Sequence, residues 1–181
     1  MDRLTKEEWL DHGLKTLATD GFTALKADKL VKTLGVSRGS FYWHFKNLAD
    51  FHAAVLRRWQ EVSVIKVIEE LESSHAGPTE KLAQLIGVAS QDDLGLSQAI
   101  RAWAFNDAKV KQLVNAVDME CIGYLAQLLK EMALKDEKAL VRAKVLYCGY
   151  LGQIMLGQSV DDEVQEILIA ELIQIATQEP V

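Results

Sequence analysis

The stretch that decides the fold is TLGVSRGSFYWHFKN, from Thr33 to Asn47. These fifteen residues hold five aromatic rings, counting His44, together with two cations and two glycines. Three explanations compete for so dense a segment: a catalytic serine, a piece of hydrophobic core, or a surface that binds a partner. The rest of the chain helps to choose between them.

The chain has 181 residues and a formal net charge of −6, and its charge is unevenly distributed. Through Gln60 there are ten Lys and Arg against seven Asp and Glu, and beyond it there are ten against nineteen. The acidic average argues against a protein whose whole surface binds nucleic acid, but the first third forms a basic patch.

The cysteines Cys121 and Cys148 are far apart and form no CxxC pair, which indicates neither a disulfide framework nor a zinc site. We also expect no metal site from the histidines, because His12, His52 and His75 lack metal-ligand spacing. There is no leader pattern and no apolar run of about 18 residues, so we expect a cytoplasmic protein that is neither secreted nor membrane-spanning.

Helical spacing of apolar residues predicts an all-α fold of about nine helices. The only prolines are Pro78 and Pro180, and the turn-forming stretch SSHAGPT, 73–79, is the clearest break. The first expected helix ends at Asp20-Gly21. Eight more are expected at about 27–34, 38–45, 48–72, 79–90, 96–106, 108–132, 136–157 and 162–178.

The segment GVSRG, Gly35 to Gly39, matches the G-x-S-x-G pattern of hydrolase nucleophiles. That motif requires a strand before the serine, whereas the preceding ADKLVKTL has a helical pattern. We therefore predict that Ser37 caps a helix, and we predict no catalytic residue and no enzyme activity.

Packing explains only part of the aromatic cluster. Phe41 and Phe45 are four residues apart and share a helix face with Leu34 and Val36, so they are expected to pack inward. The other faces carry polar aromatic and cationic side chains, which suit a groove lined with phosphates: Arg38, Ser40, Tyr42, Trp43, His44 and Lys46.

The two glycines support a binding surface. Gly35 permits a tight reversal between two short helices, and Gly39 removes a side chain where the second of them would approach a phosphate or a base edge. If Gly39 had no such role, it would only weaken the helix, by about 1 kcal/mol relative to alanine.

Together, GF at 21–22 and ADKLVKTLGVSRGSFYWHFKN closely resemble the DNA-binding signature of TetR-family transcriptional regulators, over about residues 3–60. The resemblance implies a helix-turn-helix domain over 1–47, with its motif at about 26–45, a connecting helix at about 48–72, and a ligand-binding and dimerisation domain over 48–181. It also implies a homodimeric repressor that binds a pseudo-palindromic double-stranded DNA operator. A small-molecule effector, as yet unidentified, would release it, with no other cofactor.

Nine residues make up the predicted DNA-binding set, and the resemblance implies roles for seven of them. Arg38, Gly39 and Ser40 would face base edges, while Tyr42 and His44 would contact phosphates. Trp43 would reach a base or a sugar, and Lys46 would hold the backbone. Ser37 joins this set as the cap. The sequence departs from the family at two positions: Leu25 stands where the family usually has a capping Thr, and Leu48 stands where it usually has a Lys. Each departure removes an expected phosphate contact. Lys26 and Lys46 are expected to replace these contacts, so Lys26 completes the set.

Those two departures leave an alternative open: a helical small-molecule-binding protein whose DNA recognition is non-specific.

The residues expected to line the effector pocket are Trp59, Trp103, Phe105, Asn106, Met119, Tyr124 and Tyr147. Ordinary core packing is the alternative for each of them.

The last two expected helices are apolar on more than one side, so each needs more than one partner. A two-fold interface between chains satisfies this requirement, and packing within one chain is the alternative. The residues expected at the dimer interface are Tyr150, Ile154, Ile167, Leu168, Leu172 and Ile175.

Overall fold

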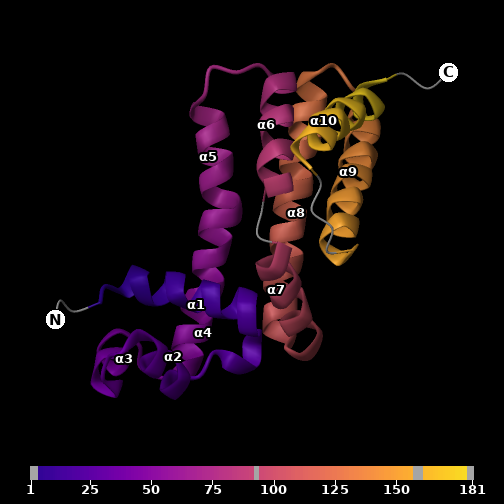
Figure 1. The fold of residues 1–181 in the computed structure, drawn as a ribbon. Coiled ribbons are helices and arrows are strands. Elements are labelled where there is room, and N and C mark those ends of the chain that lie inside the picture. Colours follow the sequence, from indigo (N-terminus) through magenta and orange to yellow (C-terminus); the bar gives the residue numbers. More distant parts are fainter. Residues whose placement is uncertain (1–3, 92–93, 157–160, 179–181) are drawn as a thin grey trace. The chain divides into compact units, whose positions relative to one another are not determined.

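A computed structural model describes residues 4–91, 94–156 and 161–178, and within these ranges every regular element is helical (Figure 1). The α-helices are α1 (Lys6–Asp20), α2 (Ala27–Leu34), α3 (Arg38–His44), α4 (Leu48–Gln60), α5 (Lys66–Ser73), α6 (Pro78–Gln91), α7 (Leu94–Asn106), α8 (Ala108–Glu131), α9 (Asp136–Leu156) and α10 (Asp162–Thr177). The all-α prediction is confirmed.

Helices α4 and α5 are continuous through a π-helical turn, Glu61–Ile65, so the described chain contains nine helices when they are counted as one. This long helix corresponds to the expected connecting helix. The sequence pattern did not predict its π-turn, which adds a residue to the helical repeat and interrupts the regular hydrogen bonding there.

Local chemistry explains where the first helices begin and end. Thr5 and Glu8 form a capping box at the start of α1, and Gly21, with a φ of 74°, ends that helix. Gly35 ends α2 in the left-handed conformation, φ 65°, which a glycine adopts without strain. Ser37 accepts a hydrogen bond from the Ser40 backbone N–H, which confirms the predicted cap of α3.

The chain folds as two compact units. The first comprises the N-terminal segment through Ser63 together with Gly95–Val114, and the second comprises Val64–Leu94 with the segment from Asn115 onward. Contacts therefore group α4 and most of α7 with the N-terminal helices. The functional division at residue 47 stays a prediction.

An aromatic core holds the first unit together. The Phe41 ring lies 5.5 Å from Trp9 and 5.4 Å from Phe51, measured between centroids, and Phe45 lies 4.9 Å from Phe51. All four side chains are fully buried. Gly13 of α1 allows this core to form, because a Cβ there would lie 2.9 Å from both Phe51 and Val55 of α4.

The second unit has its own core, formed by α5, α6, α8, α9 and α10. Its buried members include Leu82, Leu128, Ala143, Tyr147 and Ala176. Figure 1 shows α6, α8, α9 and α10 gathered side by side in this unit.

Candidate nucleic-acid interface

Helices α2 and α3 are joined by a turn of three residues, Gly35 to Ser37. The backbone N–H groups of Gly35 and Val36 donate to carbonyls in the last turn of α2, at 3.4 and 3.1 Å, so the left-handed glycine closes the helix and redirects the chain. Two short helices joined in this way form a helix-turn-helix.

The aromatic residues of α3 divide as predicted between packing and exposure. Phe41 and Phe45 lie in the core, whereas Tyr42 and Trp43 are 51% and 67% exposed. Because one face of α3 is anchored by two buried rings, the opposite face is presented outward by a rigid support.

Arg38, the first residue of α3, is paired with a residue that sequence reasoning missed. Its Nε donates to Oδ1 of Asp28, on α2, at 3.0 Å. Asp28 gave no local signal in the sequence, because nine residues separate it from Arg38 along the chain. The turn at Gly35 brings the two residues together.

The surface around Gly39 is open. A Cβ built on it would meet only the Ser37 hydroxyl, at 3.6 Å, which is an ordinary contact distance. No packing inside the protein therefore requires glycine at this position. The prediction that Gly39 leaves room for DNA is compatible with this arrangement and stays a prediction.

His44 is half-buried, with its ring turned toward the N-terminal segment. Its Nε2 lies 2.8 Å from the carbonyl oxygen of Leu4, and because a carbonyl only accepts, Nε2 carries the hydrogen. In the neutral ring the other nitrogen then has no hydrogen to donate to a phosphate. The expectation that His44 faces outward is thus wrong in part, because tertiary packing uses its donor.

The N-cap of α2 is Lys26, which corrects the expectation that Leu25 stands at the capping position. Leu25 is buried, and its carbonyl accepts from Nε2 of His52 at 2.8 Å. Lys26 is exposed and makes no side-chain cap, so its ammonium group extends from the start of α2. Lys46 is also exposed, and its backbone N–H donates to Asp50 at 3.0 Å.

The predicted effector-binding residues are not gathered around one cavity. Trp59 and Trp103 are buried in the first unit, and Tyr124 and Tyr147 are buried in the second. Three others are exposed on the surface of the described chain: Phe105, Asn106 and Met119.

Trp103 of α7 packs on the N-terminal helices. Its ring stacks on Phe22 at 4.1 Å between centroids and meets the His52 ring edge-on at 5.4 Å. Phe22 lies in the short 3₁₀ turn just before α2, so α7 contacts the segment that leads into the helix-turn-helix.

The two buried tyrosines of the second unit are hydrogen-bonded to carboxylates. Tyr124 donates to Glu72 at 2.7 Å, and Tyr147 donates to Asp118 at 2.7 Å. Burial and the contact with Glu72 raise the pKa of the Tyr124 hydroxyl. The same hydrogen bond, with help from Lys81, lowers the pKa of Glu72. Each of these two hydroxyls therefore donates its hydrogen bond to a carboxylate of the protein itself.

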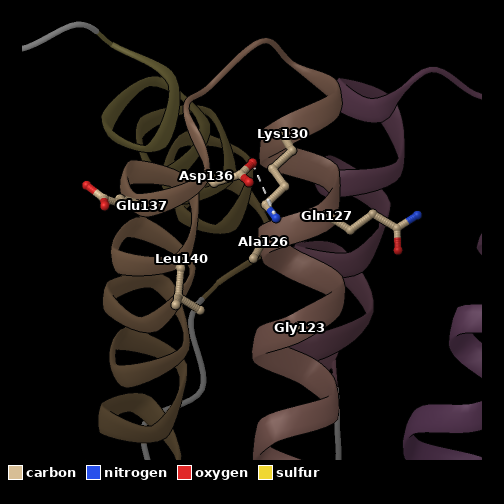
Figure 2. A pocket seen from close by; sticks show the side chains of 7 residues that line it. All are labelled: Gly123, Ala126, Gln127, Lys130, Asp136, Glu137 and Leu140. Carbon is tan, nitrogen blue, oxygen red and sulfur yellow. Dashed lines mark ion pairs between the residues drawn. The ribbon is translucent and has the colours of Figure 1, made fainter.

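A groove of about 600 Å³ lies between α8 and α9 in the second unit (Figure 2). Figure 2 shows Lys130 turned toward Asp136, 3.4 Å away, with Leu140 further along the groove, while Gln127 and Glu137 extend away from it. None of its lining residues belongs to the predicted effector set. The groove is open to solvent, so it does not enclose a ligand.

The residues predicted at the dimer interface have different environments. Ile154 is fully buried inside the protomer, so assigning it to an interface was wrong: its position along α9 faces the protein's own core. Tyr150 and Leu172 also pack partly on that core, and Leu168 is half-buried. Among the large apolar residues described on α9 and α10, eight are exposed: Leu140, Val141, Val145, Met155, Leu156, Val164, Ile167 and Ile175. Ile167 and Ile175 belong to the predicted interface set.

The described residues contain no group of three His, Cys, Asp or Glu side chains that is placed to hold a metal ion. None of the helices in this part of the chain has both the length and the apolar character needed to cross a bilayer.

A helix-turn-helix carried on an aromatic core and followed by a separate helical unit defines a DNA-binding regulator. Residues 10–55 match the family model described as bacterial regulatory proteins, tetR family. The chain is a TetR-family transcriptional regulator, and this family and fold are those of regulators rather than of enzymes.

Three individual proteins illustrate the likeness. The nucleoid occlusion factor SlmA of Vibrio atlanticus (strain LGP32) is 28% identical over 142 residues, covering 76% of this chain and 72% of SlmA. Reduced NemR from E. coli shares the fold, with a TM-score of 0.78 and 21% identity over 97% of this chain and 98% of NemR. The transcriptional regulator FadR from Bacillus subtilis, in complex with stearoyl-CoA, has a TM-score of 0.70 and 18% identity over 98% and 100% of the two chains.

Proposed function

We propose that this protein is a homodimeric, cytoplasmic repressor that binds a pseudo-palindromic DNA operator and is released from it by a small-molecule effector. It acts by binding, with no catalytic residue and no cofactor besides the effector. The observation that carries the proposal is the outward face of α3, where Arg38, Tyr42 and Trp43 are exposed above the buried Phe41 and Phe45.

The chemistry of this face suits a DNA groove. Arg38 can pair with guanine through two donors, and Lys26 and Lys46 supply charge for phosphates at the start of α2 and just after α3. Tyr42 adds a hydroxyl donor, and Gly39 adds bare backbone near the N-terminus of α3.

A pseudo-palindromic operator has two half-sites, and each is read by one helix-turn-helix. A symmetric dimer provides the two identical helix-turn-helix domains that are needed. The exposed apolar residues of α9 and α10 support dimerisation in the second unit. Monomeric proteins rarely leave so many large apolar side chains on two adjacent helices in water.

An effector would act by favouring one of two states of the protein. The stack of Trp103 on Phe22 supports such coupling, because it connects α7 directly to the segment that leads into α2. FadR, which shares the fold, was crystallised with an acyl-CoA. Similarity of fold to FadR does not identify the effector of this protein.

The experiment begins with selection of duplexes from a random pool by the full-length protein. Affinities of the enriched duplex and a scrambled one are then measured across a salt series, and binding is repeated with a panel of metabolites. A preference for the enriched duplex that Arg38→Ala relaxes at one base pair per half-site supports the proposal. Equal affinity for both duplexes at every salt concentration would overturn it.

The second candidate is a helical ligand-binding protein with non-specific DNA recognition. The observation that favours it is the position of Asp28, whose carboxylate lies beside Arg38 on the proposed DNA-binding surface. A negative charge there repels phosphates. Under this alternative, selection enriches no motif while a metabolite still shifts the melting temperature.

A further inference from the structure

The Asp28–Arg38 ion pair connects the first turn of α2 to the first residue of α3. The distance from Arg38 Nε to Asp28 Oδ1 is 3.0 Å, and the two side chains are 63% and 72% exposed. Both groups are therefore on the surface of the helix-turn-helix, where DNA would approach.

We infer that Asp28 is a specificity-determining positioning residue, which holds the Arg38 guanidinium in the orientation that reads a guanine. This inference rests on the proposed function, because it requires that Arg38 contact a base.

The geometry of the guanidinium supports this role. The group has five N–H donors in a fixed plane, and a bidentate contact with guanine N7 and O6 uses two of them. Asp28 accepts from Nε, so both terminal nitrogens stay available to the base. A carboxylate on Nε also restricts rotation of a long, flexible side chain, so less freedom is lost when the base is bound.

The charge pattern around Asp28 points the same way. From Gly21 through Ala49 the chain carries five Lys or Arg residues, and Asp28 is the only Asp or Glu. A carboxylate among cations that approach phosphates weakens binding unless it has a compensating role. Its contact with the reading arginine supplies that role.

The environment on DNA would strengthen the pair. In free protein an exposed ion pair contributes little to stability. When a duplex covers the surface and excludes water, the same contact lies in a lower dielectric and its orienting effect increases.

Asp28 also lies in the first turn of α2, where a negative charge stabilises a helix. This structural role alone would alter thermal stability without changing which base is preferred. Base preference at a single position is therefore the measurement that separates positioning from helix stabilisation.

The test uses full-length wild type, Asp28→Asn, Arg38→Ala and the double variant, each checked for folding by circular dichroism. Asp20→Asn is the matched control, because it removes the same charge from an exposed pair with Lys29, at 3.2 Å, away from Arg38. The probes are the duplex selected by wild type and a set with each base pair substituted in turn.

For Asp28→Asn, preference for the native base pair should fall about 5- to 10-fold at the position that Arg38→Ala relaxes, a part of the roughly 5- to 150-fold that one bidentate contact provides. The double variant should lose no more preference than Arg38→Ala, and Asp20→Asn should keep the wild-type preference.

Two results would overturn the inference. In one, Asp28→Asn keeps the full preference while affinities for all duplexes rise together, which is a plain charge effect. In the other, preference is lost at a different base pair, which means that Asp28 reads a base itself. If wild type selects no motif, the proposed function fails first, so the two failures are distinguishable.

Discussion

Arg58 of α4 donates through Nε to the carboxylate of Asp11 on α1, at 2.9 Å. Its Nη1 donates to Glu61, the first residue of the π-turn, at 3.1 Å. The arginine side chain is only 14% exposed, and hydrogen bonding to Asp11 is the main factor that raises its pKa. The Arg58 guanidinium thus links α1 to the start of the π-helical turn that joins α4 and α5.

We expect Arg58→Gln to lower the free energy of unfolding by about 1–2 kcal/mol, because it removes two charge-assisted hydrogen bonds from a largely buried side chain. Urea denaturation followed by circular dichroism measures the change. Asp20→Asn, which breaks an exposed pair, should change the same quantity by less than about 0.5 kcal/mol. Similar losses for both variants would contradict the prediction.

Replacement of Gly39 by alanine separates folding from DNA binding. Because a Cβ at position 39 meets nothing closer than 3.6 Å, Gly39→Ala should stabilise α3 by up to about 1 kcal/mol while it weakens operator binding. Thermal melts and a DNA titration give the two results. Gly13→Ala is the opposite case, since its Cβ would lie 2.9 Å from Phe51 and Val55, and it should lower stability.

Lys46→Ala should weaken binding to operator and scrambled DNA alike, and it should lower the slope of log affinity against log salt by about one. Its exposed ammonium is expected to displace one counterion from the phosphate backbone. Tyr42→Ala should also weaken binding but leave the slope unchanged, because the hydroxyl is neutral. A Lys46→Ala slope equal to that of wild type would show that this lysine contacts no phosphate.

Val145→Lys should convert the proposed dimer into a monomer, because Val145 is 60% exposed on α9 and a buried ammonium at an interface is unfavourable. Sedimentation velocity measures the change in mass. Val88→Lys serves as the control, since Val88 is an exposed apolar residue of α6. Dimerisation that survives Val145→Lys would place the interface elsewhere.

Stability should fall as the solution is acidified through about pH 6.5, partly because of His12. Burial, with Lys15 nearby, lowers the pKa of His12 from 6.5, so the unfolded chain binds this proton more readily than the folded one. The contribution is fully present above 6.5 and is lost as pH falls toward the lowered pKa.

Denaturation of His12→Gln at pH 8 and pH 5.5 isolates that contribution. Glutamine can still donate to the Thr33 hydroxyl, which lies 2.9 Å from His12 Nε2, but it does not titrate. The variant should therefore lose less stability between the two pH values than wild type does.

The sequence by itself determined the local features of this protein. Helix boundaries, the left-handed Gly35 and the Ser37 cap depend on residues within a few positions of one another. The inward packing of Phe41 and Phe45 follows from their spacing on one helix. Each of these features was predictable because the interacting groups are neighbours along the chain.

The tertiary structure decided which distant residues meet. Asp28 reaches Arg38 only because the turn folds α2 against α3, and the carbonyl of Leu4 takes the donor of His44 from 40 residues away. Likewise, Ile154 and Trp103 have apolar patterns that suit an interface, a pocket or a core equally well, and packing placed both in cores. Periodicity identifies an apolar face, but only the neighbouring elements determine what covers it.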